Sequence, residues 1–363
     1  MSIMKKWKKF ALRLCCCLIP SRRVRRAVRK EIFAPSETTH DDFVPTEMIQ
    51  DDFMLAFGAI GHTSWIDYML ENNMPEKVAA LRCGLDAESN AAIDRFFKYM
   101  TILPENWWWQ YKVRREFVID SRVTSEESTL MKTFEANLGQ YRQDYILDED
   151  IRCADVFLEH TGLAHANQAI KNYITGKDFI DGGAYIGDSA LVYIKNYHPK
   201  KVWSFEISEK IAVRYRNVML MNGIGEDKYE LVQAGLSHEK QTVMFNDDGN
   251  MGTSLSKAGE SKVDLVDLDS FAKERRLNVG FIKCDVEGAG VDALRGMRET
   301  IQRDRPVLML AIYHGPIEFF ETKPLLEEIV KDLDYKMMIK KYHPYPDMEI
   351  DIVLFAYPKE LEG

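Results

Sequence analysis

The sequence predicts a doubly wound α/β fold with a seven-stranded, mostly parallel sheet, preceded by a mostly helical N-terminal region. From about residue 150, short apolar segments alternate with helical patterns, which is the order that a parallel sheet covered by helices requires. A strand, a glycine-rich turn and a helix follow one another at residues 178–196, as at the ligand-binding corner of such sheets. The 363 residues leave room for a second unit.

Seven short apolar segments are expected to form the strands of this sheet. Their ranges are 179–180, 202–205, 229–232, 281–284, 307–312, 335–339 and 350–356. Helices are expected between most of them, at 188–196, 208–222, 290–303 and 322–333. Two further segments, 241–256 and 262–267, interrupt the alternation. We expect these two to form a hairpin-like insertion over the ligand-binding edge of the sheet.

The first 150 residues differ in character from the rest. Residues 1–32 form a basic segment, residues 33–150 read as a mostly helical region, and residues 151–363 form the α/β domain. Trp107, Trp108 and Trp109 are adjacent. Three adjacent aromatic residues are more typical of a core or an interface than of a sugar-stacking surface, and both readings stay open here.

The charge of the chain is unevenly distributed. Its net charge is −9, yet eleven of its 48 basic residues lie in residues 1–32 beside a single acidic one. The remaining residues are strongly acidic, which argues against a chain-wide nucleic-acid surface. We therefore expect no nucleic-acid partner, and an anionic partner for the basic segment alone.

The basic segment reads as an amphipathic helix followed, after Pro20, by a second basic stretch. Trp7 and Phe10 lie on its apolar face, with lysines between them. The apolar run at residues 10–19 is too short to span a bilayer, and no signal-peptide cleavage site follows it. This pattern favours peripheral docking of residues 1–30 on an anionic membrane surface. Packing on the body of the protein or on a partner is the alternative.

The six cysteines do not indicate a disulfide framework or a zinc site. None has zinc-ligand spacing, and a chain of this size does not need disulfides to fold. Reduced cysteines are typical of a cytoplasmic protein. We therefore expect a cytoplasmic location, peripheral on the inner face of a membrane if the basic segment docks there.

The glycine-rich turn at residues 181–188 has the sequence Asp-Gly-Gly-Ala-Tyr-Ile-Gly-Asp. Gly182 and Gly183 are expected to let the backbone approach a ligand, and Gly187 to let the helix pack against the strand. The N-terminus of the following helix presents free N–H groups. Such groups suit an anion such as a carboxylate.

Polar residues mark the ends of the neighbouring strands. Glu206 directly follows the next strand, where a carboxylate is placed to accept hydrogen bonds from two ribose hydroxyls. Gln233 and Ala234 end the third strand, and Asp285 and Glu287 follow a later one. The turn lacks the G-x-G-x-x-G spacing of dinucleotide sites. It therefore favours a nucleoside without phosphates, such as S-adenosylmethionine (SAM), over a nicotinamide cofactor, which stays the alternative.

Several of these segments together resemble the FkbM-type SAM-dependent methyltransferases, which have the class I (Rossmann-like) methyltransferase fold. The resemblance spans about residues 155–357. Two positions depart from the pattern: Tyr185 stands where an asparagine is common, and Asp267 stands where a threonine is usual. The segments that carry the resemblance are 179–190, 204–206, 267–269, 283–288 (Lys-Cys-Asp-Val-Glu-Gly) and 294–296 (Leu-Arg-Gly), with a similar lead-in at 155–163.

The resemblance implies transfer of a methyl group from SAM to an oxygen, most often on a sugar. Together with the basic segment, it predicts a glycan or glycolipid precursor of the surface-polysaccharide type as the acceptor. A non-catalytic protein that keeps the fold and binds another enzyme of glycan assembly is the alternative. The expected contacts with SAM are Asp181, Gly182, Gly183, Ala184, Tyr185, Gly187, Asp188, Glu206, Gln233, Ala234 and Asp285.

Methyl transfer to oxygen requires a group that removes the proton of the acceptor hydroxyl. His314 follows a predicted strand and is the first candidate for this base. Asp285 and Glu287 are further candidates, either as a base or as ligands of a divalent metal, although no metal site is predicted. His343 precedes the last strand and is expected to face the acceptor if it acts at all. Thr253 and Ser254 are candidate hydrogen-bonding partners of the acceptor.

Overall fold

The computed structural model describes residues 63–100, 125–151, 153–247, 249, 261–341 and 352–363. The basic segment, the three adjacent tryptophans, Thr253, Ser254 and His343 lie outside these residues. The predictions for them therefore stay predictions, as does the division of the chain at residues 32 and 150. Within the described ranges, no helix is both long enough and apolar enough to cross a membrane.

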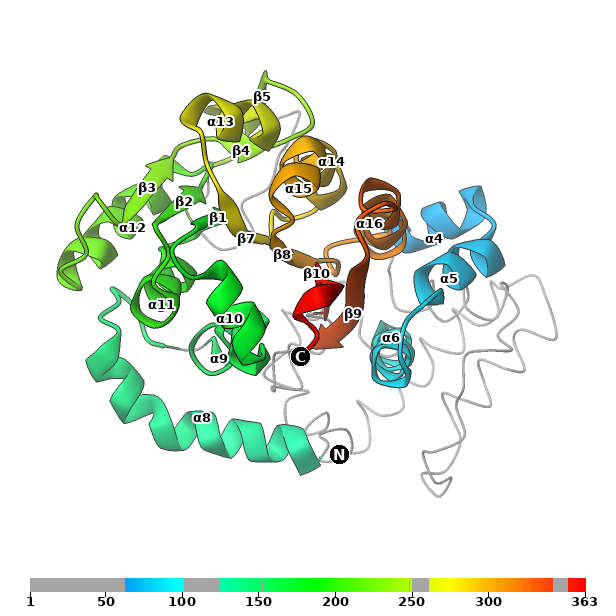
Figure 1. Cartoon of the computed structure of the whole chain (residues 1–363), viewed down its shortest axis with the longest axis horizontal. Helices are drawn as coiled ribbons and strands as arrows, with labels where there is room; N and C mark the ends of the chain where they lie inside the picture. Colours follow the sequence, from blue (N-terminus) through cyan, green and yellow to red (C-terminus); the bar gives the residue numbers. More distant parts are fainter. Residues whose placement is uncertain (1–62, 101–124, 152, 248, 250–260, 342–351) are drawn as a thin grey trace, which may run out of the picture.

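A seven-stranded sheet forms the centre of the molecule, in the order β3-β2-β1-β7-β8-β10-β9 (Figure 1). Pairing is parallel from β3 to β8, and β10 runs antiparallel to both of its neighbours. All seven predicted strands and the α/β fold class are thus confirmed. The strands are β1 (Asp178–Gly182), β2 (Lys201–Phe205), β3 (Tyr229–Val232), β7 (Val279–Cys284), β8 (Val307–Ala311), β9 (Tyr335–Lys341) and β10 (Ile352–Pro358).

Helices cover both faces of the sheet because its central strands alternate their side chains between two apolar layers. Phe179 points into one layer and Ile180 into the other. Every residue of β1, β7 and β8 is buried, as expected for parallel strands packed on both sides. The Phe179 layer holds α8 (Ser125–Asp144), α9 (Ala154–Phe157), η3 (His160–His165), α10 (Gln168–Ile174), α11 (Asp188–Tyr197), α12 (Glu209–Met221) and η5 (Lys359–Leu361). The Ile180 layer holds α13 (Leu268–Arg275), α14 (Gly290–Arg295), α15 (Arg298–Asp304) and α16 (Pro316–Ile329).

Two predicted helices have different bounds in the structure. The helix expected at 290–303 is divided into α14 and α15 at Gly296, where a side chain would place Cβ 2.0 Å from the Ser237 carbonyl oxygen. The helix expected at 322–333 begins six residues earlier, with Pro316 in its first turn. Proline suits the first turn because its fixed φ is helical and its missing N–H has no partner there.

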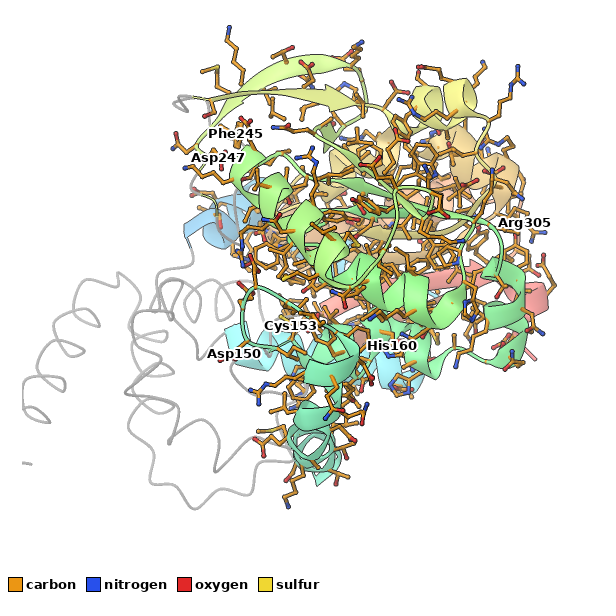
Figure 2. The ribbon with its side chains drawn as sticks, turned by 90° about the vertical axis from the view of Figure 1, so that its left-hand side faces the viewer. Asp150, Cys153, His160, Phe245, Asp247 and Arg305 are labelled. Atoms are coloured by element: carbon orange, nitrogen blue, oxygen red, sulfur yellow. The ribbon has the colours of Figure 1, made fainter. Side chains whose placement is uncertain are left out.

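The predicted insertion forms a small second sheet in the order β4-β6-β5. Its strands are β4 (Gly235–Leu236), β5 (Gln241–Phe245) and β6 (Ser261–Val266), and β5 pairs antiparallel with β6. The segment after β5 returns to the start of α12, where the Ser208 hydroxyl donates to Asp247 Oδ1 over 2.5 Å. Figure 2 shows Phe245 and Asp247 on the side of the molecule opposite Arg305, which lies two residues before β8. The insertion therefore reaches toward the carboxyl ends of the strands.

The described part of the N-terminal region is mostly helical. Helices α4 (Thr63–Glu71), α5 (Met74–Arg82) and α6 (Ala87–Met100) pack on α16 and β9 (Figure 1). Phe96 stacks on Phe319 of α16 with ring centroids 4.3 Å apart, and Lys77 pairs with Glu321 over 2.5 Å. These helices therefore support the element that follows His314.

Candidate functional site

The glycine-rich turn lies where β1, β2 and β7 end side by side. The N–H groups of Gly183 and Ala184 donate to the Phe205 carbonyl oxygen at the end of β2, over 3.1 and 3.0 Å. Gly183 has a φ of +75°, and a Cβ there would lie 1.8 Å from the Asp285 carbonyl oxygen. The missing side chain thus lets the backbone after β7 approach the turn. The sequence explained the glycine by room for a ligand, whereas the structure shows that it makes room for the Asp285 backbone.

Two other glycines of the turn also make room for protein atoms. A Cβ at Gly187, where φ is +84°, would lie 2.7 Å from the ring of Tyr215 on α12. A Cβ at Gly182 would lie 2.8 Å from the Leu236 side chain. The missing side chain at Gly187 thus makes room for α12, and its role in packing α11 against the strand stays a prediction.

Glu206 is fixed at the end of β2, beside this turn. Its Oε2 accepts from the Tyr185 N–H over 3.1 Å, and its Oε1 accepts from the Ser208 N–H over 2.8 Å. Burial raises the pKa of Glu206, against the effect of these bonds. Each carboxylate oxygen has a second acceptor position, so the group can still receive two hydroxyls.

The end of the neighbouring strand β3 lies next to Glu206. The Glu206 N–H donates to the Val232 carbonyl oxygen over 3.2 Å. Gln233 follows as an exposed residue, whereas Ala234 is buried. The structure therefore brings both predicted residues to the donor edge.

Asp181 is placed differently from what the sequence predicted. Its carboxylate has no exposed surface, and Oδ1 lies 3.5 Å from the Lys283 ammonium nitrogen. Lys283 also donates to the Gly183 carbonyl oxygen over 2.6 Å. Burial raises the pKa of Asp181, against the Lys283 charge. The residue therefore supports the turn from the interior, and the structure offers no surface for the donor contact predicted for it.

The start of α11 carries the Asp188 carboxylate, which acts electrostatically on Asp155 of α9. Asp188 Oδ1 accepts from the Ser189 N–H over 2.8 Å, and burial raises the pKa of Asp188 to about 6. Burial, and then the charges of Asp188 and Asp285, raise the pKa of Asp155 to about 7. An anion at this helix start would meet these carboxylates. Such surroundings favour a cationic group, and the carboxylate expected there from the sequence stays a prediction.

On the other side of the turn, four side chains from three segments converge. The His314 Nε2 atom lies 3.1 Å from Asp285 Oδ1 and 3.7 Å from Glu287 Oε2. Its Nδ1 atom lies 2.8 Å from Glu318 Oε2 on α16. The structure thus joins the three residues predicted for catalysis. It adds Glu318, which the sequence reasoning missed although it lies four residues after His314.

The carboxylates hold His314 in its charged form. Burial lowers the pKa of His314, but Asp285 and Glu318 outweigh this effect and raise it to about 11. Burial raises the pKa of Asp285, yet His314, Lys283 and the Tyr313 hydroxyl lower it to about 2. His314 is therefore arranged as a proton donor at neutral pH, not as the proton acceptor that the sequence predicted.

Glu287 is the member of this cluster with the most suitable properties for a base. Burial raises its pKa, and 39% of its side chain is exposed. Its backbone has a φ of +51° and is followed by Gly288 at +95°. Such left-handed conformations outside glycine are uncommon and occur often at functional sites.

The remaining site predictions have no counterpart in the described part of the chain. His343, Thr253 and Ser254 lie outside it. Among the described residues, no group of three or more His, Cys, Asp or Glu side chains is arranged to hold a metal ion. Of the described cysteines, Cys83 is exposed and Cys284 is buried.

One solved structure has a fold similar to that of this chain. It is that of the methyltransferase FkbM from Methylobacillus flagellatus KT, which shares 17% sequence identity with this chain at a TM-score of 0.51. The match covers 81% of this chain and 61% of that protein, so the chain spans less than two thirds of its length. At this identity the likeness shows the fold alone.

Two other solved structures overlap less. An rRNA methylase from Streptococcus thermophilus has 13% identity and a TM-score of 0.35, over 56% of this chain and 95% of that one. An O-methyltransferase from Bacillus cereus, in complex with SAH, has 13% identity and a TM-score of 0.36, over 68% and 97%. Such low scores carry no argument about this protein.

No protein of curated function matches the chain. The family model of the methyltransferase FkbM domain does match, over residues 181–337. This range contains the glycine turn, Glu206 and the cluster around His314. The resemblance expected from the motifs is thereby confirmed: residues 181–337 match the methyltransferase FkbM domain, and the fold of the chain is similar to that of the solved methyltransferase FkbM structure.

Proposed function

We propose that this protein is a SAM-dependent methyltransferase that methylates an oxygen of a sugar, in a glycan or glycolipid precursor of the surface-polysaccharide type. One observation carries the proposal. The Glu206 side of the glycine turn and the cluster of Asp285, Glu287 and His314 lie at the carboxyl ends of neighbouring strands. Ligands of open α/β sheets bind at this edge. A donor on the turn and an acceptor at the cluster would therefore be neighbours.

The residues beside the turn fit the charge of the proposed donor. When bound, SAM supplies an electrophilic methyl group on a positively charged sulfur, and it also carries an ammonium group. The raised pKa values of Asp155 and Asp188 show that these carboxyls lie in an acidic, desolvated environment. A cationic ligand would relieve that repulsion, and Glu206 retains acceptor positions for the ribose hydroxyls.

The cluster on the other side fits the deprotonation of a hydroxyl. We assign the base to Glu287, because its raised pKa favours proton uptake and its side chain is partly exposed. His314 holds its proton between Asp285 and Glu318 and orients the acidic groups around it. A hydroxyl acceptor needs such a base, which supports oxygen as the methylated atom. The choice of a sugar rests on the family resemblance.

Binding and turnover test the two parts of this proposal separately. Isothermal titration of SAM and of its demethylated product, S-adenosylhomocysteine (SAH), is expected to show one site per chain. Absence of binding by both would overturn the proposal. Incubation with methyl-labelled SAM and lipid-linked glycan precursors should yield an O-methylated sugar. Binding without transfer to any acceptor would favour the non-catalytic partner protein.

We further propose that residues 1–30 dock the enzyme on the cytoplasmic face of a membrane, near a lipid-linked acceptor. The net positive charge and the apolar face of this segment support the proposal. The full chain should co-sediment with vesicles containing anionic phospholipid, and a chain lacking residues 1–30 should not. Vesicles of phosphatidylcholine alone are the control. Equal co-sedimentation of both chains with anionic vesicles would refute the docking.

A further inference from the structure

The segment between α8 and α9 is fixed to the methyltransferase domain beside the glycine turn. The Ile146 N–H donates to Asn222 Oδ1 over 3.0 Å, and the Asn222 amide donates back to the Ile146 carbonyl oxygen over 2.7 Å. Figure 2 shows Asp150, near the end of this segment, on the same side of the molecule as Asp247. Residues before the FkbM domain thus reach the edge where the donor is expected.

Arg214 of α12 is the main link between this segment and the domain. Its Nε and one terminal nitrogen donate to the two carboxylate oxygens of Asp148, over 2.6 and 2.7 Å. The same terminal nitrogen donates to Glu149 Oε2 over 2.6 Å. A bidentate arginine–carboxylate pair fixes orientation as well as distance, so Glu149 is held in a defined position.

The next residue in this network belongs to the turn itself. The Tyr185 hydroxyl donates to Glu149 Oε2 over 3.1 Å and accepts from Arg214 over 3.3 Å. The Arg214 guanidinium carbon lies 5.5 Å from the centre of the tyrosine ring. The Tyr185 side chain is therefore held at both its ring and its hydroxyl.

Tyr185 needs such support because its backbone is unfavourable for a tyrosine. Its φ is +45°, in the left-handed region that glycine and asparagine adopt readily and bulky residues avoid. In this conformation its N–H points at Glu206 Oε2. The backbone of Tyr185 therefore connects the ion-pair network to the carboxylate expected to hold the ribose.

We propose that Arg214 and Glu149 are positioning residues of the donor site. They hold the Tyr185 side chain, and through it the left-handed backbone that directs the Tyr185 N–H to Glu206. This inference rests on the proposed function, since Glu206 matters here as a SAM contact. It makes the donor site depend on residue 149, which precedes the FkbM domain in sequence.

A double-mutant cycle measured as SAH affinity tests this role. Arg214→Met removes the charge and keeps the length of the side chain, and should weaken SAH binding about tenfold in titration calorimetry. Asparagine tolerates the left-handed region without support, so Arg214→Met should have almost no effect on SAH affinity in a Tyr185→Asn background. In turnover assays Arg214→Met should raise KM for SAM and leave kcat nearly unchanged.

Further variants keep the result interpretable. Arg298→Met breaks a 3.0 Å ion pair with Glu328, which lies on the helices away from the turn, and serves as the matched control for loss of an exposed arginine. Tyr185→Phe removes only the hydroxyl and should weaken SAH binding in the same direction if Arg214→Met fails to fold. Unchanged SAH affinity in both Arg214→Met and Tyr185→Phe, or an equal loss of affinity on Arg214→Met in the wild-type and Tyr185→Asn backgrounds, would overturn the inference. Failure of the wild type to bind SAH would instead overturn the proposed function.

Discussion

The two sides of the candidate site are built in different ways. The donor side is made of backbone: strand ends, three glycines and N–H groups that meet Glu206. The acceptor side is made of charged side chains from the β7 end, the β8 end and α16, which meet at His314. A backbone site holds a ligand by shape and hydrogen bonds. A cluster of charges instead controls where a proton resides.

This difference determines how far the position and the protonation of the site residues depend on other segments of the chain. On the donor side, Glu206 is placed by the end of its strand and by hydrogen bonds from the Tyr185 and Ser208 N–H groups. On the acceptor side, the protonation of His314 depends on Glu318, which is positioned by a helix packed against the N-terminal region. Substitutions on the donor side should therefore change affinity for SAM, and those on the acceptor side should change turnover or stability.

The largest effect is expected for the proposed base. Glu287→Gln removes the group that takes up the acceptor proton, and general-base catalysis contributes about 10²- to 10⁴-fold. We expect kcat to fall by about this factor while the dissociation constant for SAH stays unchanged. Single-turnover methyl transfer and calorimetry measure the two quantities. A variant with nearly full kcat would move the base to another residue.

Loss of His314 should chiefly reduce stability. His314→Gln removes a buried cation and leaves Asp285 and Glu318 without their partner, a change that typically costs about 3–5 kcal/mol. The free energy of unfolding, measured with urea, should fall by about that amount near pH 7. His238→Gln is the control, because that histidine pairs with Asp292 at the surface. Equal losses in the two variants would argue against a buried charged cluster.

The pH dependence of the unfolding free energy tests whether His314 is charged in the folded protein. Its pKa is raised to about 11 in the folded protein, so its stabilising contribution is complete below the unfolded pKa of about 6.5 and is lost as the pH rises toward 11. The difference in unfolding free energy between the wild type and His314→Gln should therefore shrink above about pH 7. A difference that grows with pH would contradict the charged state.

A smaller effect, confined to affinity, is expected on the donor side. Glu206→Ala removes the predicted acceptor for two ribose hydroxyls, which keep hydrogen bonds to water in the variant, so we expect a net loss equal to one hydrogen bond to a charged group, about 1.5–3 kcal/mol. The dissociation constant for SAM should rise about 10- to 100-fold, with kcat at saturating SAM much less affected. Asp264→Ala, on the exposed face of β6, is the control. A fall in kcat at unchanged affinity would remove the distinction between the two sides.

The smallest effect should be the pH dependence of SAM binding. Asp155 has a pKa of about 7, so it is largely protonated at lower pH and then does not attract a cation. The dissociation constant for SAM should therefore decrease about two- to tenfold as the pH rises from about 5.5 to 7.5. Asp155→Asn should flatten this profile. A dissociation constant that increases over this range would exclude a cation beside Asp155.

The sequence predicted the parts of the structure that depend on local pattern. The central strands are continuous apolar runs between turns, and the glycine turn has its own spacing, so both were found. The helix break at Gly296 depends on contact with Ser237, which is 59 residues away in sequence. The need for glycine at position 183 depends on contact with the backbone of Asp285. Neither contact has a signature within its own segment.

The same distinction applies to the site. The positions of Glu206, Asp285 and His314 follow from strand ends, but their protonation depends on burial and on partners from other elements. The sequence predicts His314 as a base because it follows a strand, at the edge of the sheet where ligands bind. Glu318 changes this, and only its spacing of four residues from His314 offered a hint. The acidic surroundings at the start of α11 likewise depend on burial and on carboxylates from other elements, which no local pattern shows.

The central claim is that one edge of the sheet has a donor side that binds and an acceptor side that reacts. Titration of SAH into the wild type, Glu206→Ala and Glu287→Gln tests it most directly. The account predicts tight binding by the wild type, equally tight binding by Glu287→Gln and a 10- to 100-fold loss in Glu206→Ala, about 1.4–2.8 kcal/mol. No binding by the wild type, or equal affinity of all three for SAH, would contradict it.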